Sequence, residues 1–323
     1  MIQDQQKHEM LQVVETEKLY LLRIDYQEGD IGSAIGHVFS SVGTRQQGEA
    51  LSPVLGTNEP LRKLWASPSG SLWVASANGS VGTTAAVSWP APASGADYLT
   101  LGASPKWSAI DLPRVRATRL PPNVTALWGT SDADVYAGTY GGHIYRWDGA
   151  AWKQVFDGPE SGRGTIQAFA GSVDDVYAVG KEGTFLHFDG TGWRPLLAPG
   201  PPNGHELLTG VLRMPDGQAL ISASGDIGRL LYGSAAGGFA EFGRYPIHLI
   251  GMAPLGERIL FATGDGVAEL IDRNVTMIKS SFKTASISPG RGRVFFIEPA
   301  QEQPCYVEYD PSVTDALWWR MKY

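Results

Sequence analysis

The chain has 323 residues and a single cysteine, Cys305, so it cannot form an internal disulfide. This scarcity of cysteine fits a reducing compartment. No apolar run reaches the roughly 18 residues that a membrane-spanning helix needs. Residues 1–8 are polar and lack the apolar segment of a signal peptide. We therefore expect a cytoplasmic protein that does not bind membranes.

Charge is also scarce: charged residues make up 18% of the chain, and the net charge is −7. Binding to a phosphate backbone requires an excess of lysine and arginine, so this balance argues against a nucleic-acid partner. An acidic surface suits a basic protein partner, although mild acidity is also ordinary among soluble proteins. The long runs of alanine, glutamate, lysine and leucine that are typical of helix bundles are missing as well.

Patterns that indicate catalysis or metal binding are missing too. The histidines are not spaced like metal ligands, and one cysteine cannot complete a zinc site. The histidines of the chain are His8, His37, His143, His187, His205 and His248. No nucleophile elbow, phosphate-binding loop, dinucleotide fingerprint or calcium loop is present. We expect neither cofactor nor metal, and we do not expect an enzyme.

Two carboxylate pairs, Asp132 with Asp134 and Asp174 with Asp175, could be taken for acid–base machinery. Both pairs fall between two expected strands, where aspartate commonly accepts hydrogen bonds from nearby backbone N–H groups. A structural role in a turn is therefore the favoured interpretation.

Glycine, by contrast, is abundant, with 40 residues, and the chain contains one pattern twice. The first copy comprises residues 126–129, 134–137, Gly142, 145–149 and Trp152. The second comprises residues 168–171, 175–178, Gly183, 186–190 and Trp193. The offset between the copies is 42 residues at their start and 41 from the Asp-Val-Tyr onward. A period near forty with several short apolar runs predicts one four-stranded β-propeller blade per copy.

The parts of each copy fit the strands of a blade. The first run is small and apolar, which suits the crowded innermost strand, and Gly142 and Gly183 fit turns with positive φ. Asp148-Gly149 and Asp189-Gly190 predict hairpins with a type I′ turn, in which both central residues have φ > 0. Trp152 and Trp193 then fall on the outer strands, where a large ring covers the gap between neighbouring blades.

Weaker copies of the pattern occur along the rest of the chain. Counting them predicts seven four-stranded blades in one all-β domain, with six as the alternative. The expected starts are Leu11, Leu64, Leu127, Phe169, Leu212, Ile250 and Ile287. Residues 1–10 are interpreted as a polar lead-in and residues 11–323 as the propeller, with its clearest blades at 123–156 and 165–197. Because unpaired edge strands favour aggregation, we expect the N- and C-terminal strands to share a blade and close the ring.

Residues 126–152 and 168–193 resemble a divergent bacterial WD40-like and tectonin-like propeller repeat of the form W-G-x-x-x-D-D-V-Y-A-V-G-x-x-G-x-I-x-H-[WF]-D-G-x-x-W. Residues 64–107 match it weakly, and the rest of the chain matches only in outline. The resemblance implies a propeller and does not specify an activity, since such repeats serve many binding roles.

Loops between the second and third strands and between blades converge on one rim of a propeller, where partners commonly bind. The predicted partner-binding residues on these loops are Tyr140, Glu160, Arg163, Lys181, Glu182, His205, Glu206, Asp226 and Asp265. Asp157 and Glu302 belong to the same loops. The pattern also breaks down in an inserted loop at residues 88–100 and in a basic cluster, Arg114, Arg116 and Arg119, which is interpreted as a linker or outer strand.

These observations favour a non-catalytic protein-binding propeller that is a monomer when free. The most specific hypothesis is a cytosolic immunity protein that neutralises a basic bacterial toxin or effector domain, because charge complementarity speeds the encounter with a cationic enzyme. One alternative is a tectonin-like lectin that stacks glycans on the repeated aromatic residues. Another is an enzyme with a site in the central channel, although innermost strands such as Ala-Leu-Trp-Gly lack ionisable groups.

Overall fold

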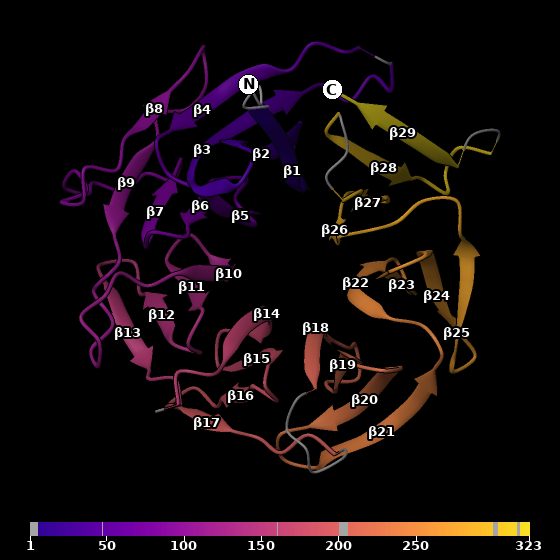
Figure 1. Cartoon of the computed structure of the whole chain (residues 1–323). Helices are drawn as coiled ribbons and strands as arrows, with labels where there is room; N and C mark the ends of the chain where they lie inside the picture. Colours follow the sequence, from indigo (N-terminus) through magenta and orange to yellow (C-terminus); the bar gives the residue numbers. More distant parts are fainter. Residues whose placement is uncertain (1–5, 47, 160, 200–205, 300–302, 315–316) are drawn as a thin grey trace.

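The computed structural model describes residues 6–46, 48–159, 161–199, 206–299, 303–314 and 317–323. The described strands form seven antiparallel sheets that are arranged as blades around a central axis (Figure 1). The chain is therefore a seven-bladed β-propeller, as the repeat predicts, and the six-bladed alternative is wrong. No helix in the part of the chain that the structure describes could cross a membrane.

Each blade takes its strands from one stretch of the chain, with a single exception in blade 1. Blade 1 contains β1 (Gln6–Glu15), β2 (Leu19–Gln27), β3 (Asp30–Ser41), β4 (Ser52–Thr57) and β8 (Tyr98–Thr100). Blade 2 contains β5 (Leu61–Ala66), β6 (Leu72–Ser76), β7 (Ser80–Thr83) and β9 (Ser108–Asp111). Blade 3 contains β10 (Val124–Ser131), β11 (Asp134–Thr139), β12 (Ile144–Trp147) and β13 (Trp152–Phe156).

The remaining four blades follow in chain order. Blade 4 contains β14 (Thr165–Ser172), β15 (Asp175–Lys181), β16 (Phe185–Phe188) and β17 (Trp193–Pro195). Blade 5 contains β18 (Leu207–Arg213), β19 (Ala219–Ser224), β20 (Gly228–Ser234) and β21 (Gly238–Tyr245). Blade 6 contains β22 (Leu249–Leu255), β23 (Arg258–Thr263), β24 (Gly266–Ile271) and β25 (Asn274–Lys279). Blade 7 contains β26 (Ser286–Pro289), β27 (Val294–Ile297), β28 (Cys305–Tyr309) and β29 (Trp318–Lys322).

The N-terminal strand begins earlier than the sequence predicts. β1 starts at Gln6, so residues 6–10 of the predicted lead-in belong to blade 1, while residues 1–5 lie outside the described part. The polar residues Gln6, Lys7 and His8 pair with the far end of β2, at Gln27, Tyr26 and Asp25. Backbone pairing with β2 therefore extends the strand beyond the apolar pattern that marked its expected start.

The aromatic residues of the repeat fill the gaps between blades, as expected from their positions. Trp152 is buried between blades 2 and 3 with Trp73 and Trp147. Trp193 packs between blades 3 and 4, where its ring lies 6.2 Å from Phe169 and 5.9 Å from Tyr136. The apolar core thus consists of clusters between adjacent sheets, and each large ring contributes on the order of 2–3 kcal/mol by leaving water.

The Asp-Gly hairpins differ from the prediction. Gly149 and Gly190 have positive φ, but Asp148 and Asp189 do not, so the turns are not type I′. Trp147 pairs with Trp152 across a four-residue loop, within which the Asp148 carboxylate accepts hydrogen bonds from the N–H groups of Ala150 and Ala151. The aspartate therefore stabilises the loop through the hydrogen bonds of its side chain and not through a positive φ.

The N- and C-terminal strands do not share a blade, so the prediction of how the ring closes is wrong. β1 hydrogen-bonds to β2, and β29 hydrogen-bonds to β28, so the first and last strands belong to adjacent, separate sheets. The N-terminal segment forms the innermost strand of a complete blade instead of the outer strand of the last one. We call the contact between blades 7 and 1 the closing seam; its hydrogen bonds involve side chains, as in those from the Ser286 hydroxyl to the carbonyl of Leu11 and from Arg291 N–H to the Glu15 carboxylate.

The insertion in blade 2 links two blades. It begins after β7, which ends at Thr83, and it ends where β9 begins. Between these two strands of blade 2, β8 pairs antiparallel with β4 of blade 1. The Tyr98 hydroxyl hydrogen-bonds to Ser80 of blade 2 at 2.8 Å, and the ring of Trp89 packs against Trp73 and Trp147. The insertion therefore crosses the outside of blade 2 and adds a fifth strand to blade 1.

Candidate protein-binding rim

We call the rim that carries the second-to-third-strand turns and the inter-blade connections the loop rim. The connection from β9 to β10 contributes the most distinctive part of it. Its backbone folds back on itself, because Arg119 N–H donates to the carbonyl of Val115 and Val115 N–H donates to the carbonyl of Leu120. Arg116 fixes this fold to blade 3 by donating from its backbone N–H and its guanidinium to Gln154.

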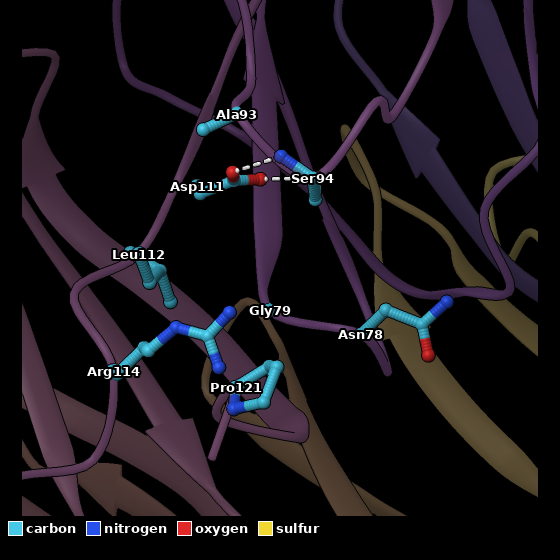
Figure 2. Close-up of a pocket in the computed structure, with 8 residues that line it drawn as sticks. All are labelled: Asn78, Gly79, Ala93, Ser94, Asp111, Leu112, Arg114 and Pro121. Carbon is cyan, nitrogen blue, oxygen red and sulfur yellow. Dashed lines mark hydrogen bonds between the residues drawn. The ribbon is translucent and has the colours of Figure 1, made fainter. Parts of the chain in front are cut away.

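A pocket of about 260 Å³ lies where this connection meets the insertion and the β6–β7 turn (Figure 2). Asp111 forms one wall and accepts hydrogen bonds from the backbone N–H and hydroxyl of Ser94, at 2.7 and 2.6 Å. Figure 2 shows the guanidinium of Arg114 on the other side, directed towards Gly79 and Pro121. A pocket of this volume, lined by both charged and apolar residues, has room for a single side chain of a bound peptide.

Gly79 explains why the connection can pack so closely at this point. It has φ of +88°, and a Cβ atom there would lie 2.7 Å from the Pro122 ring. Its carbonyl accepts a hydrogen bond from Leu112 N–H at 2.8 Å. Any other residue would have to push the connection away from the β6–β7 turn, so this glycine sets the shape of the pocket.

Two of the three arginines in the basic cluster have no carboxylate partner among the described residues. Arg116 lies 3.5 Å from Asp157, whereas Arg114 and Arg119 form no ion pair with any described residue. The guanidinium of Arg114 instead donates to the carbonyl of Arg119 at 3.0 Å. The connection is thus a positive segment on the loop rim of an acidic protein.

Large apolar side chains are exposed next to these arginines. Leu120 is 62% exposed and Tyr140, on the β11–β12 turn, is 64% exposed. Tyr140 N–H donates to the carbonyl of Asn123, which ties the turn to the end of the β9–β10 connection. Arginine and tyrosine are enriched at protein interfaces, and rigid presentation reduces the entropy cost of binding.

Most of the predicted partner-binding residues lie on successive loops of blades 3 to 6. Tyr140 pairs with Thr165, and Gly141 N–H donates to the carbonyl of Gly164, the neighbour of Arg163. Lys181 pairs with Thr165, which brings the exposed end of β15 to the same place. Asp226 and Asp265 are exposed on turns of blades 5 and 6. Glu160 and His205 lie outside the described residues.

Glu206 has a structural role that the sequence did not reveal. Both of its carboxylate oxygens accept hydrogen bonds from the buried Arg229, at 2.6 and 2.8 Å. Arg229 also donates to Glu241 at 3.0 Å and to the carbonyl of Pro199. The carbonyl of Glu206 accepts a hydrogen bond from Gly183 N–H, next to the exposed Glu182. Glu206 therefore anchors the connection into blade 5, and its charge is already balanced.

His143 supports the loop rim from beneath. Its Nδ1 accepts a hydrogen bond from Gly158 N–H at 2.9 Å, which positions the start of the connection into blade 4. Burial lowers the pKa of His143, and the nearby Asp157 opposes this only in part. The neutral ring is thus favoured, as an acceptor at Nδ1 requires.

On the opposite rim, a member of each carboxylate pair has a structural role, but it is not the turn role that the sequence favoured. Asp132 and Asp175 bind side chains from other strands and blades, where backbone N–H groups of their own turns were expected. Asp132 links blades 3 and 2 by accepting hydrogen bonds from Ser69, Ser71 and the indole N–H of Trp73. Asp175 lies 2.7 Å from His187 and 2.6 Å from Arg213 of blade 5. These carboxylates hold neighbouring blades together. No cluster of three or more potential metal ligands exists within the described ranges.

No protein-family model matches the sequence, and no curated protein matches it. Solved structures do match the fold. The extracellular domain of the putative hybrid two-component system BT4673 from B. thetaiotaomicron has 11% identity and a TM-score of 0.50, covering 80% of this chain and 34% of its own length. The computationally designed Ika8 protein has 13% identity and a TM-score of 0.55, with 94% and 84% covered.

A third structure, YCF48 bound to D1 peptide, has 10% identity and a TM-score of 0.55, with 81% of this chain and 80% of that chain covered. The likeness establishes the fold as a β-propeller. At these identities it establishes nothing finer. A fold of this kind is typical of protein-binding scaffolds, and this one presents a rigid rim of loops on which such binding commonly occurs.

The sequence missed the pocket because its walls come from three separate segments, residues 78–79, 93–94 and 111–121. Two signals were present, however. The insertion breaks the repeat, and the basic cluster precedes a pair of prolines that fix the connection. The repeated tryptophans, in contrast, pack between blades, so Trp152 offers no exposed ring face for a sugar.

Proposed function

We propose that this propeller is a non-catalytic scaffold that binds another protein through its loop rim, at blades 2 and 3. The observation that carries the proposal is the exposed pair Leu120 and Tyr140 beside Arg114 and Arg119, two cations that form no ion pair with any described carboxylate. An apolar centre with an arginine rim is the composition of a protein interface. The pocket next to it provides room for one anchoring side chain of the partner.

The test is affinity capture from native lysate with the wild-type chain and the Leu120→Glu and Tyr140→Ala variants. Val173→Glu is a matched control, because Val173 is also exposed but lies on the β14–β15 turn of the opposite rim. We expect Leu120→Glu to abolish capture of the partner and Val173→Glu to leave it unchanged. Equal capture by all three variants, or no partner for the wild type, contradicts the proposal.

A separate and more specific proposal, which uses the acidic part of the loop rim at blades 5 and 6, is a cytosolic immunity protein that neutralises a basic toxin. Its support is the net charge of −7 together with the exposed Asp226 and Asp265, which would face a cationic partner on blades 5 and 6. Cells that produce the cognate toxin should survive with the wild-type protein and die with Asp226→Lys/Asp265→Lys. Survival with both, or with neither, rejects the immunity role without affecting the general binding proposal.

A further inference from the structure

The innermost strands carry an uneven distribution of charge. Within the described structure, β5, β10, β14, β18, β22 and β26 contain no aspartate or glutamate. β1 contains Glu9, whose carboxylate lies 3.5 Å from the Tyr26 hydroxyl, and Glu15, which pairs with Arg293. In contrast, β5 carries two adjacent cations, Arg62 and Lys63. The inner wall of blade 2 is thus positive in a protein whose net charge is −7.

A regular bulge in the innermost strands defines the position of Lys63. In six blades the register shifts by one residue near the start of the innermost strand. In blade 2 the residue in the bulge is Arg62, and Lys63 follows it and pairs with Ala75. The equivalent residues after the bulge are Gln12, Ala126, Ala168, Gly210 and Gly251. Four of these five are alanine or glycine, so Lys63 occupies a position that elsewhere holds a small side chain.

A side chain at this position points towards the next blade around the ring. A Cβ atom at Gly210 would lie 3.3 Å from Met252 of blade 6, and one at Gly251 would lie 3.1 Å from Ile287 of blade 7. By the same geometry the stem of Lys63 starts out towards β10 of blade 3. Lys63 nevertheless stays partly exposed. Long cationic side chains often bury their stem and keep the charged end in water in this way.

No residue that the structure describes balances the charge of Lys63. Neither Arg62 nor Lys63 forms an ion pair with a described residue. Burial lowers the pKa of Lys63, and the nearby charge of Arg62 lowers it further. The carboxylate closest in sequence, Glu59, is buried in the connection before β5, where its charge helps to raise the pKa of Tyr98. Two neighbouring cations without a counter-ion destabilise the folded chain, since each disfavours the charge of the other.

We propose that Arg62 and Lys63 form an oxyanion-binding site on the inner wall of blade 2, entered along the axis of the ring. A phosphate or carboxylate oxygen between the two cations would supply the charge that the inner strands lack. The position after the bulge projects a long side chain in blade 2, whereas four other blades have an alanine or glycine there. The site is separate from the exposed pair Leu120 and Tyr140, so it does not depend on the proposed partner-binding surface.

The test is thermal unfolding of the full chain at pH 7 in a chloride buffer of constant ionic strength. The probes are inorganic phosphate and triglutamate, which distinguish a free oxyanion from a carboxylate of a peptide. At saturation we expect at least one probe to raise the unfolding temperature of the wild type by about 3 °C. The Arg62→Gln/Lys63→Gln variant should show no such rise, while Lys106→Gln, which removes an exposed lysine elsewhere, should respond like the wild type.

The free protein provides a second readout. Because the unbalanced charge is costly, Lys63→Gln should raise the unfolding temperature without any probe, whereas a purely structural lysine would lower it. Its folded-state pKa is lowered, so the cost is present at neutral pH and disappears as the pH rises towards the ordinary value of 10.5. If the glutamine pair does not fold, Lys63→Met serves the same test. A wild type that responds to neither probe, or a neutral variant that responds equally, overturns the proposal.

Discussion

Two seams of the ring join neighbouring blades by different means. Between blades 3 and 4 the contact is aromatic: Phe169 lies 6.0 Å from Tyr136, 6.4 Å from Trp128 and 6.2 Å from Trp193, measured between ring centroids. The closing seam between blades 7 and 1 also contains apolar residues, but arginines and carboxylates run through it. The comparison shows that the same blade geometry can be held by ring packing or by a partly buried ion network.

The ion network of the closing seam has Glu308 at its centre, with no exposed surface. Arg293 lies 2.8 Å from Glu308 and 2.7 Å from Glu15 of blade 1. Arg45, on the β3–β4 loop of blade 1, pairs with both Glu308 and Asp310, and its guanidinium lies over the ring of Trp319. Two arginines thus connect carboxylates from both blades where the sequence led us to expect that the N- and C-terminal strands share one blade.

The largest effect is expected in the aromatic seam. Phe169→Ala removes a buried ring that three others contact and leaves a cavity, so the free energy of unfolding should fall by about 3–5 kcal/mol. Phe169→Leu keeps most of the volume and should cost less than about 1.5 kcal/mol. Urea denaturation measures both. Similar losses for the two variants would mean that the seam does not depend on filling this space.

The closing seam should be the next most sensitive. Arg293→Ala leaves Glu15 and the buried Glu308 with less compensation, which should cost about 2–4 kcal/mol of unfolding free energy. Because Arg45 and Arg293 share Glu308, their losses should not add: the double variant should differ from the sum of the single ones by about 0.5 kcal/mol or more. Urea denaturation of the three variants gives this coupling, and strict additivity would show that the network does not act as a unit.

Acid should separate the two seams. Burial opposes ionisation of Asp310, but hydrogen bonds from Ser312 and Arg45 prevail and lower its pKa below the ordinary 3.8. A lowered carboxyl pKa stabilises the folded state above 3.8, and this contribution is lost as the pH falls through the folded-state value. The loss caused by Arg45→Ala should therefore shrink from pH 7 to pH 3, while that of Phe169→Ala should not. Calorimetry at both pH values tests this, and a constant Arg45→Ala effect contradicts it.

The smallest effect is expected where the insertion joins blades 1 and 2. Tyr98→Phe removes the hydroxyl that hydrogen-bonds to Ser80 but retains the ring, so the cost should be about 1 kcal/mol. Hydrogen exchange should increase at β8 and β4 and stay constant in blade 4. Exchange that rises equally throughout the ring would mean that the insertion does not stabilise this region locally.

The repeat predicted the number of blades because every blade needs the same kinds of residue at the same spacing. Runs such as Val135-Tyr136-Ala137 must form a central strand, and Trp152 must cover a gap, so these residues carry their roles in their spacing. The blades predicted at residues 123–156 and 165–197 correspond to Val124–Phe156 and Thr165–Pro195. Features that all blades share could therefore be predicted from the sequence.

Features that depend on one contact between distant residues were not readable. Arg45 and Glu308 are more than two hundred residues apart, and nothing in either segment indicates that they meet. For the same reason the sequence assigned Glu206 to partner binding, although Arg229 neutralises it. The pocket beside Arg114 combines three segments; the insertion and the basic cluster were marked as departures from the repeat, but nothing in either indicates that they meet at the β6–β7 turn.

The strand β8 has a mechanical consequence. It runs along the outer edge of blade 1 although its chain belongs to blade 2, so these two blades cannot separate without stripping a strand from a sheet. Blades 7 and 1 have no such covalent strap, and β1 and β29 reach the seam from opposite ends of the described chain. Stretched by its two ends, the ring would break first at the closing seam, and blades 1 and 2 would come away together.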